Sequence, residues 1–158
     1  DVWGKEQATL ELLRNVGKGG NLDWFLLNES ELREMARVHL LHDANESPCS
    51  HDDFDGQGKA LSKRLTAGVA AHARGWSQTF RKGASEAREE VSVITPLRTT
   101  GAGDVWNAGF MAGILIGLVP ALRIGLANAV ASLYVARASG PPATLAQVRE
   151  ALSGGPGK

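Results

Sequence analysis

The chain of 158 residues contains 17 basic and 17 acidic residues, so its net charge is zero, and 43% of it is hydrophobic. This composition is ordinary for a single globular domain, and the balanced charge argues against nucleic acid as a partner. A single cysteine, Cys49, excludes an internal disulfide. With no secretory signal pattern at the start of the sequence, we expect a reducing, cytoplasmic location.

Hydrophobic periodicity and turn residues predict helices that alternate with short strands. Helices are expected at residues 6–16, 28–40, 59–66, 103–118, 121–138 and 145–152. Strands are expected at residues 24–27, 69–72, 77–80 and 91–95. A polar surface loop is expected at residues 43–58 and a disordered tail at 153–158. The alternation predicts an α/β fold with a mostly parallel sheet flanked by helices.

The apolar segment at residues 108–122 has the composition of a membrane span but not its length. Gly109, Gly113 and Gly117 are spaced by four residues, which allows close helix packing in bilayers. A span needs roughly 20 apolar residues, whereas Pro120 and Arg123 interrupt this one. We therefore expect a buried helix and no membrane partner.

The tetrapeptide G-A-G-D at residues 101–104 combines a flexible turn with an acidic side chain. If a helix begins here, its first N–H groups are unpaired and form an anion site strengthened by the helix dipole. A bound phosphate would repel the Asp104 carboxylate, so this residue is expected there only if it takes part in a reaction, for example by accepting the proton of an attacking hydroxyl. The alternative is that Asp104 only caps a helix after a glycine turn.

The longer string T-T-G-A-G-D-V-W-N-A-G-F at residues 99–110 follows a strand-like V-S-V-I-T-P. It resembles the second signature of the ribokinase-like (phosphofructokinase-B type) carbohydrate kinases. The segment I-G-L-A-N-A-V-A-S-L-Y-V-A-R at residues 124–137 resembles the helix that follows in that family, and L-D-W-F-L-L-N-E-S-E at 22–31 resembles its strand ending in N-x-x-E. The resemblance implies that residues 1–152 form the C-terminal part of a ribokinase-like domain.

This resemblance implies a transfer of the γ-phosphoryl group of ATP to a hydroxyl of a sugar or nucleoside. Asp104 would be the general base, and the amides of Gly101, Ala102 and Gly103 would form the anion hole. The residues implied at the nucleotide site are Asn28, Glu31, Thr100 and Asn128. Glu31 would organise Mg²⁺, most simply through a water molecule.

Two of these matches have structural alternatives. Asn28 and Glu31 also have the spacing of a helix capping box. Asn128 lies among apolar helix residues, where its amide would merely satisfy a neighbouring polar group. Both roles stay open for each residue.

The chain also departs from the family pattern. Arg98 stands where the family commonly has an aspartate that helps to bind an activating monovalent cation. Arginine cannot ligate a cation but supplies a fixed positive charge, so one hypothesis is an enzyme that does not depend on potassium. The alternative is a solvated loop residue paired with a surface acid. After the strand at 69–72, His72 and Arg74 stand near the place of the family's Thr-x-Gly turn, and we assign neither a role.

Nothing in the sequence matches the family's N-terminal half, which carries sugar recognition. We therefore expect a fragment that is inactive without a complementing half, and the sugar, the donor nucleotide and the oligomeric state stay open. The competing function is a non-catalytic interaction module that keeps the fold. His39, His42, Cys49 and His51 lie close in sequence, but their spacing follows no common zinc pattern, and a solvated loop is the simpler interpretation.

Overall fold

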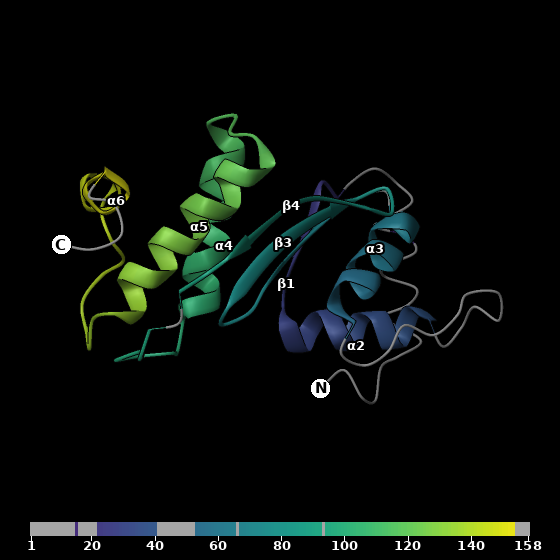
Figure 1. Ribbon diagram of the computed structural model, residues 1–158, viewed down its shortest axis with the longest axis horizontal. Helices are drawn as coiled ribbons and strands as arrows, with labels where there is room; N and C mark the ends of the chain where they lie inside the picture. Colours follow the sequence, from purple (N-terminus) through teal and green to yellow (C-terminus); the bar gives the residue numbers. More distant parts are fainter. Residues whose placement is uncertain (1–14, 16–21, 41–52, 66, 93, 154–158) are drawn as a thin grey trace. The chain divides into compact units, whose positions relative to one another are not determined.

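The structure is a computed structural model that describes residues 15, 22–40, 53–65, 67–92 and 94–153 (Figure 1). The chain divides into two compact units. The first comprises Asp1–Ala73 and Gln78–Arg88, and the second comprises Arg74–Ser77 and Glu89–Lys158. Most of each unit is therefore continuous in sequence.

A four-stranded sheet has the order β1-β2-β3-β4, with β1 at Trp24–Asn28, β2 at Gly68–His72, β3 at Trp76–Arg81 and β4 at Ala84–Glu90. Strands β1 and β2 are parallel, with Trp24 opposite Gly68 and Asn28 opposite His72. The connections from β2 to β3 and from β3 to β4 are too short for a crossover, so these pairs are antiparallel. The sheet is therefore mixed, and the parallel arrangement expected from the sequence holds for β1 and β2.

The turn between β3 and β4 fixes where the last strand begins. Lys82 and Gly83 both have positive φ, 52° and 81°, as a two-residue hairpin turn of the primed type requires. Pairing then starts at Ala84 and ends at Glu90. The strand expected at residues 91–95 was wrong, because its β-branched residues follow the hairpin strand and, at 91, 92, 94 and 95, have no strand structure.

Helices α2 (Glu29–Leu40) and α3 (Phe54–Arg64) pack against each other and against β1 and β2 (Figure 1). Leu32 and Ala36 are buried on α2, and Leu61 is buried on α3. Helix α3 begins earlier than predicted, so the expected loop at residues 43–58 was wrong in its last five residues. The side chain of Asp53 caps the helix by accepting from the N–H of Gly56 at 2.8 Å.

Glycine suits this helix because of close packing. A Cβ atom on Gly58 would collide with the ring of Phe80, a fully buried residue of β3. The sequence reads as a polar, glycine-rich loop, but the glycine serves a contact between α3 and the sheet. Packing therefore overrides the low helix propensity of glycine here.

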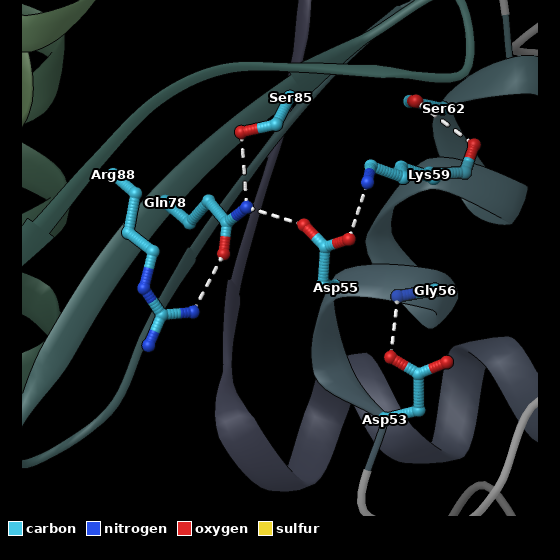
Figure 2. Close-up of polar contacts among 8 residues, drawn as sticks. All are labelled: Asp53, Asp55, Gly56, Lys59, Ser62, Gln78, Ser85 and Arg88. Carbon is cyan, nitrogen blue, oxygen red and sulfur yellow. Dashed lines mark hydrogen bonds and ion pairs between the residues drawn. The ribbon is translucent and has the colours of Figure 1, made fainter.

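A polar network around the buried Gln78 joins α3 to β3 and β4 (Figure 2). Gln78 is 2% exposed, and its Nε2 donates to Asp55 Oδ1 at 2.7 Å and to Ser85 Oγ at 2.9 Å. Its Oε1 accepts from Arg88 Nη1 at 3.1 Å. The pKa of Asp55 is lowered, first by the hydrogen bond from Lys59 and then by that from Gln78. Every polar atom of the Gln78 amide group thus has a partner, as a buried amide requires.

The second unit is built on three helices, α4 (Ala102–Leu115), α5 (Pro120–Val135) and α6 (Leu145–Ser153). Helices α4 and α5 form a hairpin whose buried residues include Trp106, Phe110, Ile124 and Ala127. The rings of Trp106 and Phe110 stack with centroids 5.4 Å apart. Gly109 allows α4 and α5 to approach each other closely, because a Cβ there would lie 2.9 Å from the Cα of Ala127. The three C-terminal helices predicted from the sequence are therefore confirmed, with ends shifted by up to three residues.

The apolar segment at residues 108–122 is divided between α4, which ends at Leu115, and α5, which begins at Pro120. Among the described residues, no helix has both the length and the apolar composition needed to cross a membrane. The helix expected at 6–16, apart from residue 15, and the loop residues 43–52 lie outside the described residues. The tail expected at 153–158 also lies outside them, except Ser153, which belongs to α6 and contradicts the prediction there.

Candidate functional site

The G-A-G-D segment of the second unit forms the entry to helix α4. Gly101 is the N-cap residue with φ 83° and ψ −1°, a left-handed conformation that favours glycine. A Cβ at this position would also lie 2.9 Å from the hydroxyl oxygen of Tyr134. The chain therefore enters α4 through a turn that both the backbone angles and the neighbouring tyrosine restrict to glycine.

The first N–H groups of α4 are those that the sequence predicts to form an anion site. The cap residue has no side chain to receive them. The N–H of Ala102 already donates to the carbonyl of Thr99 at 3.1 Å, whereas Gly103 and Asp104 donate no backbone hydrogen bond to any residue in the described ranges. With the positive end of the helix dipole, these groups favour an anion.

Asp104 lies in the first turn of α4 and is exposed. Within the part of the chain that the structure describes, its carboxylate has no hydrogen bond or ion pair. One turn later, Oδ1 of Asn107 is buried without a partner in that same part of the chain. A capping aspartate would bond to the helix N–H groups, which Asp104 does not do. Its carboxylate is therefore available to a ligand.

Arg98 precedes this loop and is bound to backbone carbonyls rather than to an acid. Its Nε donates to the carbonyl of Tyr134 at 2.9 Å and its Nη1 to that of Gly140 at 2.8 Å. The guanidinium carbon also lies 3.4 Å from the centroid of the Tyr134 ring. Among the described residues, Arg98 has no carboxylate partner, so the expected alternative of a surface ion pair was wrong.

Asn128, on α5, is engaged in a polar cluster within the second unit. Its Oδ1 accepts from Trp106 Nε1 at 2.8 Å, and its Nδ2 donates to Ser77 Oγ at 2.8 Å and to Glu89 Oε2 at 2.7 Å. Ser77 is fully buried and Trp106 is 2% exposed. The amide thus has the structural role that the sequence left open, and its contribution to a nucleotide site stays a prediction.

In the first unit, Asn28 and Glu31 form a capping box at the start of α2. The N–H of Asn28 donates to Glu31 Oε2 at 2.8 Å, and the N–H of Glu31 donates to Asn28 Oδ1 at 2.9 Å. His72 is paired in register with Asn28 at the carboxyl ends of the two parallel strands. Burial lowers the pKa of His72, and the carboxylate of Glu31 opposes this shift. In α/β proteins, ligands bind at such strand ends.

The histidine and cysteine residues considered as metal ligands are largely beyond this description. His42, Cys49 and His51 lie outside the described residues, as does the side chain of His39. Among the side chains that the structure describes, no group of three or more histidine, cysteine, aspartate or glutamate residues could hold a metal ion.

Sequence reasoning missed the residue that links these features, Tyr134. Its hydroxyl donates to the carbonyl of Thr100 at 3.0 Å, and its own carbonyl accepts from Arg98. A lone tyrosine within a helix of mostly small and aliphatic residues was the available signal. Asn107 was also missed, and its position three residues after Asp104 on the same helix was the signal there.

No family model matches the chain, and a search of curated proteins gives no match either. Solved structures do match. An adenosine kinase from Sinorhizobium meliloti is 25% identical over 97% of this chain and 41% of its own, with a TM-score of 0.66. A probable sugar kinase from Rhizobium etli CFN 42 is 19% identical over 97% of this chain and 41% of its own, with a TM-score of 0.68.

A ribokinase from Cryptococcus neoformans var. grubii serotype A, solved in complex with ADP, is 22% identical over 82% of this chain and 44% of its own, with a TM-score of 0.62. Further matches include a ribokinase from Thermotoga maritima and a putative phosphofructokinase from Staphylococcus aureus. The chain spans 41% to 44% of the length of the adenosine kinase, the probable sugar kinase and the Cryptococcus ribokinase, or about two fifths.

Proposed function

We propose that this chain, which has the fold of the ribokinase-like carbohydrate kinases, belongs to an enzyme that transfers the γ-phosphoryl group of ATP to a hydroxyl of a sugar or nucleoside. The names of the structural neighbours support a kinase of this class. Because the chain spans 41% of the adenosine kinase it matches, the activity is proposed for a protein that supplies the rest of the fold, in the same chain or as a complementing half.

One observation carries this proposal: the carboxylate of Asp104 stands exposed and unpaired, within the described structure, beside unpaired N–H groups at the start of α4. A bound phosphate would repel this carboxylate, so an aspartate at this place is unfavourable unless it takes part in the reaction. The left-handed Gly101 turns the chain sharply into α4 directly before these N–H groups.

In the proposed reaction, the acceptor hydroxyl lies against Asp104 and its oxygen attacks the γ-phosphorus of ATP. The carboxylate accepts the hydroxyl proton, the bond to the β-phosphate oxygen breaks, and ADP leaves. The amides of Gly101, Ala102 and Gly103 stabilise the negative charge on the transferred group, after the N–H of Ala102 gives up its bond to Thr99. Thr100 belongs to the same loop, where its carbonyl is fixed by Tyr134.

Magnesium would serve this reaction by neutralising charge on the nucleotide phosphates. Glu31 fits a hydrated ion, because one carboxylate oxygen accepts from the N–H of Asn28 while the other has no hydrogen bond among the described residues. Mg²⁺ keeps several waters in most protein sites, so a single carboxylate that receives a water is a sufficient contact. Asn28 then orients Glu31 through the capping box.

The test compares Asp104→Asn with Asp23→Asn in the protein that supplies the rest of the fold, in the same chain or as a complementing half. Asp23 is also exposed and lies directly before β1. We expect Asp104→Asn to lower turnover by about a hundredfold to ten-thousandfold, the usual contribution of a general base, with an unchanged Kd for ATP. Asp23→Asn should leave both values unchanged. Normal turnover by Asp104→Asn would remove the assignment of the base.

A second candidate function is an interaction module that keeps the fold without catalysis. The observation that favours it is the apolar surface where α4 turns into α5, with Leu115 82% exposed, Ile116 67% exposed and Val119 58% exposed. Such a surface suits another polypeptide chain. If neither this chain nor the protein that supplies the rest of the fold binds ATP, the first function fails.

A further inference from the structure

Arg98 closes the C-terminal end of helix α5 in the second unit. The carbonyl of Tyr134, which accepts from its Nε, lies in the last turn of that helix, and the carbonyl of Gly140, which accepts from its Nη1, lies in the connection that follows. The carbonyl groups at a helix C-terminus carry partial negative charge and attract a cation. The guanidinium group therefore occupies a place that is suited to positive charge.

The charge of Arg98 is not neutralised within the described structure. No carboxylate there forms an ion pair with it, and Nη2 is buried without a partner. Carbonyl groups bind the guanidinium through dipoles and leave its net charge in place. Arg98 is half-buried, so its remaining positive charge is available to attract an anion nearby.

Tyr134 connects this cation to the loop that precedes α4. The guanidinium carbon lies 3.4 Å from the centroid of the tyrosine ring, and the hydroxyl at the far end of the ring donates to the carbonyl of Thr100 at 3.0 Å. A further bond runs from the N–H of Leu97 to the carbonyl of Val135 at 2.8 Å. The segment 97–100 is thus bound to the last turn of α5 by the N–H of Leu97, the side chain of Arg98 and the carbonyl of Thr100.

We infer that Arg98 is a positioning residue that acts as a tethered cation. It holds the end of α5 and, through Tyr134, the loop that aims the N–H groups of α4, and it adds positive charge to the region that receives the phosphate. This inference rests on the proposed function for the identity of the anion. The structural half of it, the binding of a cation by the carbonyls of Tyr134 and Gly140, does not.

A consequence is that removal of the side chain leaves two carbonyl groups at a helix C-terminus that attract a cation from solution. Guanidinium ion has the shape and donors of the lost group, so it should restore the contacts in an Arg98→Ala variant. Lysine keeps the charge but not the planar pair of donors. Arg98→Lys should therefore restore part of the effect and also provides a second variant if Arg98→Ala does not fold.

The experiment measures the thermal unfolding midpoint and the Kd for ATP of the wild-type chain and its variants, with choline chloride or KCl at equal ionic strength. Arg137→Ala is the matched control, because Arg137 is also near the end of α5 but its side chain has no hydrogen bond or ion pair among the described residues. Guanidinium is added at a low millimolar concentration, far below the range that denatures proteins.

We expect the wild type to have the same midpoint and Kd in both salts. Arg98→Ala should melt several degrees lower and bind ATP about tenfold more weakly, and guanidinium should restore both values. Arg137→Ala should not respond to guanidinium. A lower midpoint in Arg98→Ala with unchanged ATP affinity would overturn the positioning role. A wild type that depends on K⁺, or a variant that guanidinium does not rescue, would overturn the tethered cation.

If the wild-type chain does not bind ATP, the protein that supplies the rest of the fold is used for that measurement. Absence of binding there too means that the proposed function has failed. The midpoints with and without guanidinium still decide whether Arg98 serves as the cation at the end of α5. The two failures are therefore distinguishable.

Discussion

The contact between α4 and α5 allows a test of packing in which two glycines have opposite expected effects. Gly109 lies in the interior of α4 and is buried, and a Cβ there would lie 2.9 Å from the Cα of Ala127. Gly125 lies in the interior of α5, and a Cβ there would lie 3.6 Å from Oε2 of Glu89, an ordinary contact. Substitution by alanine therefore changes the same chemical group in two different surroundings.

The magnitude follows from two terms. Alanine is about 0.8–1.0 kcal/mol more favourable than glycine in a helix interior, and both variants gain this term. Overpacking against a backbone atom that cannot move freely costs about 1–3 kcal/mol, and Gly109→Ala alone has this term. We expect Gly109→Ala to lower the free energy of unfolding by about 1 kcal/mol and Gly125→Ala to raise it by up to about 1 kcal/mol.

Urea unfolding followed by circular dichroism measures both variants. The difference between them cancels the propensity term and gives the packing term of about 1–3 kcal/mol directly. The slope of the free energy against urea should not change. If Gly109→Ala were as stable as Gly125→Ala, the close approach of α4 and α5 at this glycine would be refuted.

The remaining predictions concern the first unit. Burial lowers the pKa of His72, so the unfolded chain binds the imidazole proton more readily than the folded chain. The free energy of unfolding should therefore fall as the pH drops through the ordinary histidine value of about 6.5. His72→Gln should remove this pH dependence in urea titrations at several pH values, and an unchanged dependence would contradict the burial of His72. Gln78→Met removes three hydrogen bonds of a buried amide, so the free energy of unfolding should fall by about 1–2 kcal/mol. Equal urea midpoints for this variant and the wild type would mean that the hydrogen bonds of Gln78 to Asp55 and Arg88 do not stabilise the fold.

The sequence predicts best those elements whose burial pattern is local. The strand at Trp24–Leu27 and the three C-terminal helices have runs of apolar residues bounded by clear turn residues. The start of α3 could not be predicted, because its glycines indicate a loop and the reason for Gly58 is the ring of Phe80, which is distant in sequence. Strand β4 at Ala84–Glu90 was missed, and a strand was expected at 91–95 instead, because the β-branched residues there have a higher strand propensity.

At the candidate site, the sequence indicates which residues matter more readily than what they contact. The glycine turn before Asp104 and the capping spacing of Asn28 and Glu31 are local patterns, and the structure has both. The partners of Arg98 are carbonyl groups 36 and 42 residues away. Backbone carbonyls carry no sequence signal, so the residue types predicted an acidic side chain as the partner of Arg98 instead.

The position of Gly101 shows how folding and the proposed chemistry depend on one another in the second unit. Its φ of 83° disfavours any other residue, and the hydroxyl of Tyr134 independently excludes a Cβ there. The same hydroxyl fixes the carbonyl of Thr100, so the loop is held by a side chain 34 residues further along the chain. The loop therefore takes its shape only when α4 and α5 have packed together. An anion that binds at the start of α4 should in turn stabilise this hairpin, because it binds the folded unit and not the unfolded chain.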